Sequence, residues 1–149
     1  MVLVFFSTTR PIMQTIVYAQ DRAITPQQLA DVFTRSGIVR PVDDLPRLEK
    51  MLQHGNLLVT AWDGVRLVGV ARALSDFSFC CYLSDLAVDL AYQNKGIGQA
   101  LIEQVRSAIG RDSMLLLLAA PDAMAYYPKV GFEAVGNGWI IKRPSAAAI

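Results

Sequence analysis

The feature that most constrains this chain is the segment Gln93-Asn94-Lys95-Gly96-Ile97-Gly98. It follows an apolar run, Tyr82 to Val88, that is typical of a buried strand, and it precedes an amphipathic stretch, Gln99 to Ile109, that is typical of a helix. Two glycines one residue apart at a helix start leave backbone N–H groups uncovered, and the helix N-terminus carries a partial positive charge. The segment therefore predicts a binding site for a phosphate-bearing ligand.

Other glycine patterns explain the segment less well. A Rossmann dinucleotide site needs a third glycine where this chain has Leu101, and a Walker loop needs Gly-Lys followed by Ser or Thr, which this sequence lacks. A glycine pair can also merely relieve crowding at a helix start. A second motif downstream, Tyr126-Tyr127-Pro128-Lys129-Val130-Gly131-Phe132, favours the ligand site, because two ordered motifs rarely coincide by chance.

The two motifs together resemble the GNAT superfamily of N-acetyltransferases. The order strand, Gln-x-x-Gly-x-Gly, helix is similar to the family's acetyl-CoA pyrophosphate loop, and the second motif is similar to its aromatic-Tyr-x-x-x-Gly-Phe segment. The resemblance covers roughly Ile12 to Arg143. Within the superfamily, Gly69 to Asp76, Ser84 to Val88 and Arg40-Pro41 resemble the branch of chloroplast-type serotonin and arylalkylamine acetyltransferases and small bacterial acetyltransferases.

The resemblance implies an α/β (α+β) GNAT fold: a mixed, mostly antiparallel sheet of about seven strands, with splayed parallel strands 4 and 5, and about four helices. We expect a single domain over residues 1–149, with a core of about 12–143 and an N-terminal extension of 1–11. The sequence patterns predict the following elements. The strands are Ile12–Tyr18, Leu57–Trp62, Val65–Leu74, Phe77–Val88, Met114–Ala119, Glu133–Val135 and Trp139–Lys142, and the helices follow Thr25 and Asp43 and span Gln99–Ile109 and Asp122–Val130.

Composition limits the partners of the chain. A hydrophobic fraction of 53% and a charged fraction of 18% are typical of a globular domain. The net charge of +1 predicts no general attraction to nucleic acid. The apolar run Val2 to Phe6 is too short to span a bilayer, so we expect no membrane partner and a cytoplasmic location. Cys80 and Cys81 are adjacent and no Cys/His spacing suits zinc, so we expect no metal.

The resemblance implies acetyl-CoA, and hence coenzyme A, as the cofactor. Backbone N–H groups near Ala87 and Val88 are expected to hold the thioester oxygen, because the fourth and fifth strands of the family splay apart. Lys95 and Lys129 would offer point charges to the phosphates. The expected cofactor-binding residues are Leu86, Ala87, Val88, Gln93, Asn94, Lys95, Gly96, Ile97, Gly98, Gln99, Tyr127 and Lys129.

Acetyl transfer to an amine by direct attack in a ternary complex needs a neutral amine and a protonated leaving thiolate. Asp85, the only acid in its apolar run, is the candidate base. The alternative is that Asp85 only pairs with Arg72 or another cation on a neighbouring strand. Tyr127 is the candidate acid by its place in the motif. The alternative, an aromatic core residue, suits Tyr126 better.

The acceptor is expected to be a small primary amine with an apolar or aromatic body. Candidate substrate-binding residues are Arg72, Asp76, Phe77, Phe79 and Tyr82. Dimerisation is common in such folds, and the apolar hairpin expected near the C-terminus would suit a homodimer. The alternative function is a non-catalytic acyl-CoA-binding sensor or regulatory domain. That alternative draws support from Ala120, which stands where many family members carry Asn or Asp seven residues before the Tyr.

Overall fold

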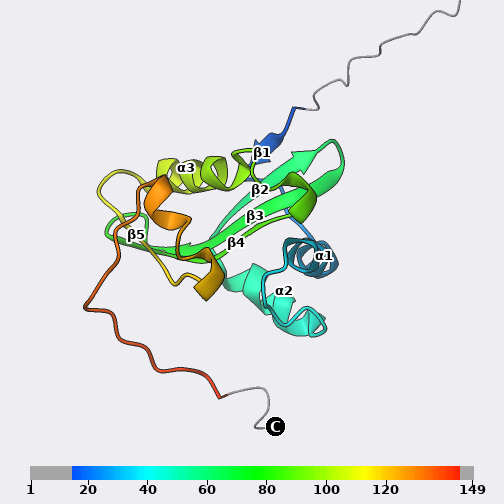
Figure 1. Ribbon diagram of the computed structural model, residues 1–149. Helices are drawn as coiled ribbons and strands as arrows, with labels where there is room; N and C mark the ends of the chain where they lie inside the picture. The colour runs from blue at the N-terminus through cyan, green and yellow to red at the C-terminus, as the bar shows by residue number, and fades with distance from the viewer. Residues whose placement is uncertain (1–14, 145–149) are drawn as a thin grey trace, which may run out of the picture. The chain divides into compact units, whose positions relative to one another are not determined.

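Five strands form one sheet in the order β1-β2-β3-β4-β5 (Figure 1). The computed structural model describes residues 15–144, so the expected extension of residues 1–11 lies outside the described part. The strands are β1 Val17–Ala19, β2 Leu57–Asp63, β3 Arg66–Ser75, β4 Cys80–Val88 and β5 Met114–Leu117. The first four pair antiparallel, and β4 and β5 pair parallel. The expected mixed sheet with a parallel fourth and fifth strand is therefore confirmed.

Of the three α-helices in the described residues, two begin at a side-chain cap and the third does not. In α1 (Pro26–Ser36), the Thr25 side chain accepts from Gln28 N–H and the Gln28 side chain accepts from Thr25 N–H, a complete capping box. In α2 (Leu45–His54), the cap is Asp44 rather than Asp43. The third, α3, spans Ile97–Ile109, so it begins two residues before the predicted Gln99, and its N-cap residue is Gly96. None of the helices within residues 15–144 is long and apolar enough to cross a membrane.

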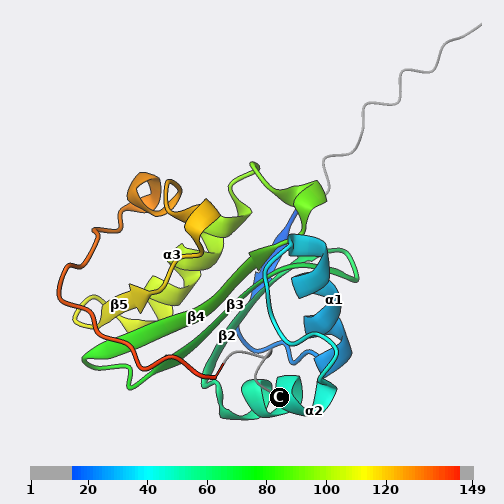
Figure 2. The ribbon, with the colours of Figure 1, turned by 60° about the horizontal axis from the view of Figure 1, so that its bottom comes forward.

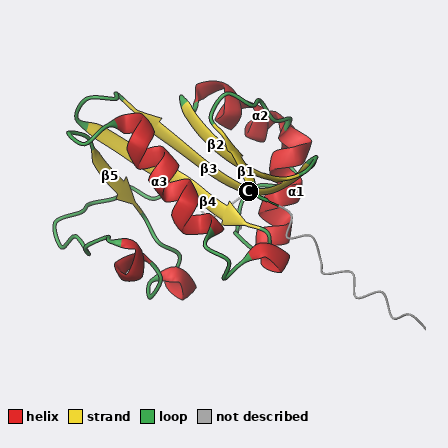
Figure 3. Ribbon diagram, turned by 90° about the horizontal axis from the view of Figure 1, so that it is seen from above, coloured by secondary structure: helices red, strands yellow, loops and turns green. Residues whose placement is uncertain are grey.

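The helices cover both faces of the sheet (Figure 3). Helices α1 and α2 pack on one face, where Phe33 and Leu48 join Val70 of β3 in a fully buried cluster. Helix α3 packs on the other face, over Gly69. A Cβ atom at Gly69 would lie 3.1 Å from the Leu101 side chain, so a larger residue there would push α3 away. The helices thus bury the centre of β3 and β4 and hold the C-terminal end of β4 in place.

Residue contacts divide the chain into two compact units, one ending at Leu118 and one beginning at Ala119. The first contains all five strands and the three α-helices of the described residues. The second, as far as it is described, contains two short 3-10 helices, η2 Pro121–Ala123 and η3 Tyr127–Val130. A third 3-10 helix, η1 Leu90–Tyr92, follows β4 in the first unit.

The expectation of about seven strands and four helices is wrong for the described residues. The predicted helix Asp122–Val130 is replaced by η2 and η3, because Pro128 lies inside it and lacks the N–H that an α-helix needs. The predicted hairpin of Glu133–Val135 and Trp139–Lys142 forms no strand. A lone two-stranded hairpin is marginally stable in water, and Gly136 and Gly138 weaken it further. The argument for a homodimer that was based on this hairpin therefore no longer holds.

Candidate active site

The first part of the candidate site is an open edge of β4. Strand β5 pairs only with residues Cys80–Leu83, whereas β4 continues to Val88 without a partner strand on that side among residues 15–144 (Figure 2). The N–H of Asp89 donates to Val68 O of β3 at 2.8 Å. Because N–H groups alternate in direction along a strand, the N–H groups of Leu86 and Val88 point to the open edge and that of Ala87 points to β3. The edge therefore presents strand donors to a ligand.

The second part is the N-terminus of α3. Gly96 has φ of 81°, no side chain caps the helix, and no acidic residue lies in its first turn. Helices α1 and α2, in contrast, are capped by Thr25 and Asp44. The first N–H groups of a helix have no intrahelical partner, so those of Ile97, Gly98 and Gln99 can bind an anion.

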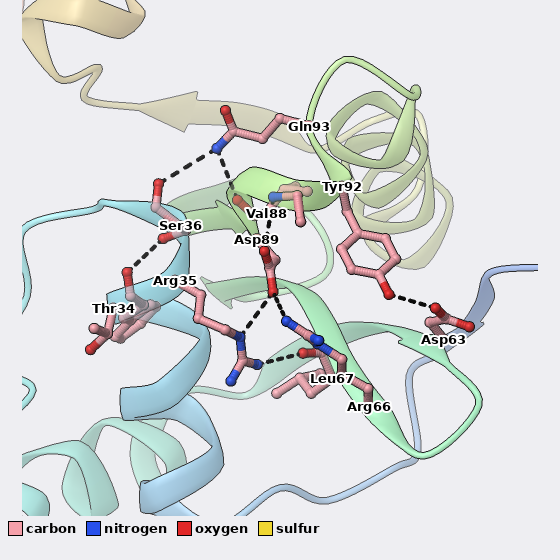
Figure 4. A network of polar contacts seen from close by, with 12 residues as sticks. Thr34, Arg35, Ser36, Asp63, Arg66, Leu67, Val88, Asp89, Tyr92 and Gln93 are labelled. Carbon is pink, nitrogen blue, oxygen red and sulfur yellow. Dashed lines mark hydrogen bonds and ion pairs between the residues drawn. The ribbon is translucent and has the colours of Figure 1, made fainter.

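The Gln93 side chain, at the start of the glycine-rich segment, is used to hold the segment in place (Figure 4). Gln93 Nε2 donates to Val88 O at 2.9 Å and lies 3.5 Å from Ser36 O at the end of α1. Lys95 Nζ lies 5.4 Å from the centre of the Tyr92 ring, and Asn94 has a left-handed backbone with φ of 61°. The Gln93 side chain is therefore occupied within the protein, and the backbone of the segment, with Lys95, is left for phosphate binding.

Asp89, which the sequence analysis missed, is the centre of a polar network under the segment (Figure 4). Its Oδ2 accepts from Arg35 Nε at 2.9 Å and from Arg66 Nη2 at 2.8 Å, and its Oδ1 accepts from Ala91 N–H. Burial by itself would raise the pKa of Asp89, but these hydrogen bonds outweigh burial and lower it. The sequence feature that could have identified Asp89 is an acidic residue directly after the last residue of a predicted strand.

Tyr92 ties the same segment to the β2–β3 turn. Its hydroxyl lies 2.5 Å from Asp63 Oδ2, and this hydrogen bond is the main cause that raises the pKa of Tyr92. The segment before α3 is thus held to α1 through Asp89 and Gln93, and to the end of β2 through Tyr92.

Asp85, the candidate base, lies between two arginines. Its Oδ1 accepts from Arg40 Nε and its Oδ2 from Arg72 Nε, both at 2.5 Å, and its side chain is fully buried. The pairing with Arg72 that the sequence left open is therefore present. Arg40 was not expected as a partner, because it lies 45 residues away in the chain.

The charged candidates for substrate binding are engaged elsewhere. Arg72 is buried and also donates to Ser84 Oγ and Met51 O. Asp76 Oδ1 accepts from the N–H groups of Phe79, Cys80 and Ser78, which lower the pKa of Asp76 well below its usual value. Arg72 is therefore not an open charge for a substrate, whereas the Asp76 carboxylate is held through Oδ1 but is exposed and stays ionised.

The aromatic candidates are exposed. Phe77, Phe79 and Tyr82 are 47%, 76% and 38% exposed, at the end of the sheet where β3 turns into β4. Tyr82 pairs with Leu74 of β3, which is 43% exposed, so the two side chains lie on one face. The structure therefore gives these three candidates an exposed aromatic surface, next in the chain to the exposed Asp76 carboxylate.

Tyr127 and Lys129 lie in η3 of the second unit and are described within that unit alone. The Tyr127 ring contacts Tyr126 and Phe132 edge-on, with ring centres 5.3 Å and 5.6 Å apart. Burial raises the pKa of Tyr126. Both tyrosines are half-buried, so they pack against aromatic neighbours but are not core residues.

A mixed sheet with an open strand edge beside an uncapped helix N-terminus is the arrangement that the resemblance to the GNAT superfamily implies. The family model of the acetyltransferase (GNAT) domain matches residues 22–140. The chain therefore belongs to the GNAT acetyltransferase family, whose members use acetyl-CoA.

Relatives of known name agree with this family. The chain is 41% identical over 75 residues to histone acetyltransferase TAP1 of Glycine max, covering 49% of this chain and 32% of that protein. It is 30% identical over 115 residues to the chloroplastic GCN5-related N-acetyltransferase 1 of Arabidopsis thaliana, covering 74% and 57%. The chain thus spans about a third of the length of the soybean relative.

Solved structures show the same fold. A GNAT family acetyltransferase of Streptococcus pneumoniae has a TM-score of 0.69 at 22% identity, covering 87% of this chain and all of that one. The aminoglycoside N-acetyltransferase AAC(6')-Iy, solved with CoA, has a TM-score of 0.67 at 15% identity, covering 91% and 99%.

Proposed function

We propose that this protein transfers the acetyl group of acetyl-CoA to a primary amine of a small molecule, by direct attack in a ternary complex. The observation that carries the proposal is the open edge of β4 leading into the uncapped N-terminus of α3. The pyrophosphate would bind the N–H groups of Ile97, Gly98 and Gln99, and the N–H groups of Leu86 and Val88 would bind the thioester oxygen and the pantetheine.

Each chemical step can be assigned to a group of this chain or to the acceptor. The neutral amine attacks the thioester carbon, the C–S bond breaks, and the leaving thiolate takes a proton, for which Tyr127 is the proposed donor. The resulting tyrosinate regains a proton from water before the next turnover. The amine must lose one proton for each transfer. Both oxygens of Asp85 already accept from arginines, so we propose that this proton leaves to water and that Asp85 acts as an ion-pair partner.

Direct attack is favoured over an acetylated cysteine intermediate. Desolvation and the nearby Asp76 carboxylate raise the pKa of Cys80, and desolvation raises that of Cys81. A thiol with a raised pKa holds its proton near neutral pH and is a poor nucleophile. A two-step route through either cysteine would therefore be slow.

The surface chemistry favours an apolar acceptor. Phe77, Phe79 and Tyr82 offer exposed aromatic surface, and the neighbouring Asp76 holds its own loop through Oδ1. Burying one aromatic ring contributes about 2–3 kcal/mol, which suits a weakly selective site for arylalkylamines. A polycation needs several open carboxylates, and among the candidate residues only Asp76 is an exposed one.

A panel of acceptors tests this assignment. We expect release of the CoA thiol, and an acetylated product by mass spectrometry, with tryptamine and phenethylamine, and little with spermidine or a lysine peptide. The lysine peptide matters because the soybean relative is named a histone acetyltransferase. Turnover of spermidine or the peptide without turnover of any arylalkylamine would overturn the acceptor class and leave acetyl transfer intact.

The second candidate is a non-catalytic acyl-CoA sensor, which the engagement of Asp85 by two arginines favours. In that case CoA binds, but no amine releases the thiol. The cytoplasmic location stays a prediction, and the Arabidopsis relative is named chloroplastic.

A further inference from the structure

The C-terminal half of β4 and the residue that follows the strand carry two buried carboxylates, which are held in the same way. Asp85 pairs with Arg40 and Arg72, and Asp89 pairs with Arg35 and Arg66. In each case one arginine comes from β3 and the other from α1 or the segment that follows it. The two ion-pair clusters differ in what else they hold.

The Asp85 cluster holds an irregularity in β4. The pairing of β3 with β4 shifts between Arg72 and Ala73, from Asp85 as partner to Leu83, so Ser84 has no partner in β3. Arg40 Nη2 donates to Ser84 O at 2.9 Å, and Arg72 Nη2 donates to Ser84 Oγ at 3.0 Å. Two guanidinium groups therefore fix both the carbonyl and the hydroxyl of this bulge residue.

The bulge lies where β4 leaves β5. Leu83 is the last residue of β4 that pairs with β5, and Leu86, two residues after Ser84, is the first to present its N–H to the open edge. A bulge re-aims the strand that follows it. The orientation of Ser84 thus sets where the proposed donor to the thioester oxygen points.

We infer that Arg40 is a positioning residue for acetyl transfer: it holds the Ser84 bulge so that the Leu86 N–H meets the thioester oxygen. This inference rests on the proposed acetyl transfer. Arg40 makes no contact with the reacting atoms in this account and acts through Ser84 O and Asp85. Its planar guanidinium reaches both groups at once, which the single ammonium of a lysine does not do.

The Asp89 cluster holds a different part of the site. It fixes η1 and the segment that leads to α3, through Ala91 N–H and Arg35. Arg35 is therefore a matched partner for comparison: it is an arginine from the same region of the chain, it pairs with a buried aspartate of the same strand end, and it lies under the proposed phosphate site rather than beside the thioester.

The test compares Arg40→Lys with Arg35→Lys, with the wild-type enzyme assayed alongside. For Arg40→Lys we expect kcat to fall about 10- to 100-fold, because small displacements of a catalytic donor cost rate, while the Kd for CoA stays within about twofold. For Arg35→Lys we expect the reverse, a higher Kd and KM for the cofactor with a smaller change in kcat. Asp85→Asn should resemble Arg40→Lys and keep the pH–rate profile of the wild type.

The outcomes are separable. No thiol release by the wild type with any amine overturns the proposed function. Turnover by the wild type with equal kcat in Arg40→Lys overturns the role of Arg40 alone. If both variants lose the same amount of melting temperature, and the folded variants do not differ in whether kcat or Kd changes, both clusters serve only the stability of the fold. A shift of the Asp85→Asn profile to higher pH would make Asp85 the base and contradict this inference.

Discussion

Replacing Gly98 by aspartate is expected to weaken CoA binding at least about 100-fold while leaving the protein folded. Gly98 is the second residue of α3, a helix whose first turn carries no acid and no side-chain cap. An acid in a first turn favours the helix itself, because it meets the positive end of the dipole. The same carboxylate occupies the anion site and repels a pyrophosphate, so helix stability and cofactor affinity should change in opposite directions.

The control for Gly98→Asp is a charge at the matching position of another helix. Gln27 is the second residue of α1, is exposed, and lies at a helix start that is already capped. Calorimetric titration with CoA should show unchanged affinity for Gln27→Glu and almost none for Gly98→Asp, with native-like circular dichroism for both. Unchanged affinity of folded Gly98→Asp would remove the α3 N-terminus from the site.

Replacing Tyr127 by phenylalanine is expected to lower kcat by about 10²-fold, because the leaving thiolate loses its proton donor. The ring contacts with Tyr126 and Phe132 survive this change, since they involve ring faces and edges and not the hydroxyl. The Kd for CoA should therefore stay close to that of the wild type. Stopped assays of thiol release at saturating acetyl-CoA measure the effect.

Tyr126→Phe is the matched control for Tyr127→Phe. It removes the same hydroxyl from the neighbouring ring of the same segment and should leave kcat within about twofold. Equal rates for Tyr127→Phe and the wild type would contradict the role of Tyr127 as acid. Water would then be the proton donor.

Local chemistry was readable from the sequence where it depends on neighbouring residues. The Thr25–Gln28 capping box is present, and the Asp63-Gly64 turn joins β2 to β3, with Gly64 at φ of 58°. The order of strand, glycine-rich segment and helix around Gly96 is also present. These features need only short-range geometry, which residue type largely determines.

Features that depend on distant residues could not be predicted from the sequence. The ion pair of Asp85 with Arg40 is one example, and the network of Asp89 with Arg35 and Arg66 is another. These contacts join residues up to 54 positions apart in the chain. The final hairpin was predicted from a local pattern around Asn137, but a hairpin is stable only when other strands or helices pack against it. Because no such packing is present, the local pattern predicted two strands that the structure does not contain in residues 133–142.

The central claim is that acetyl-CoA binds along the open edge of β4 and at the N-terminus of α3. The most direct measurement is an NMR titration of ¹⁵N-labelled protein with CoA, in which the chemical shifts of the amide signals are recorded. The account predicts the largest shifts at Leu86, Val88, Ile97, Gly98 and Gln99, and small shifts at the capped starts of α1 and α2. Saturable shifts that spare these five amides, or no shifts at millimolar CoA, would contradict it.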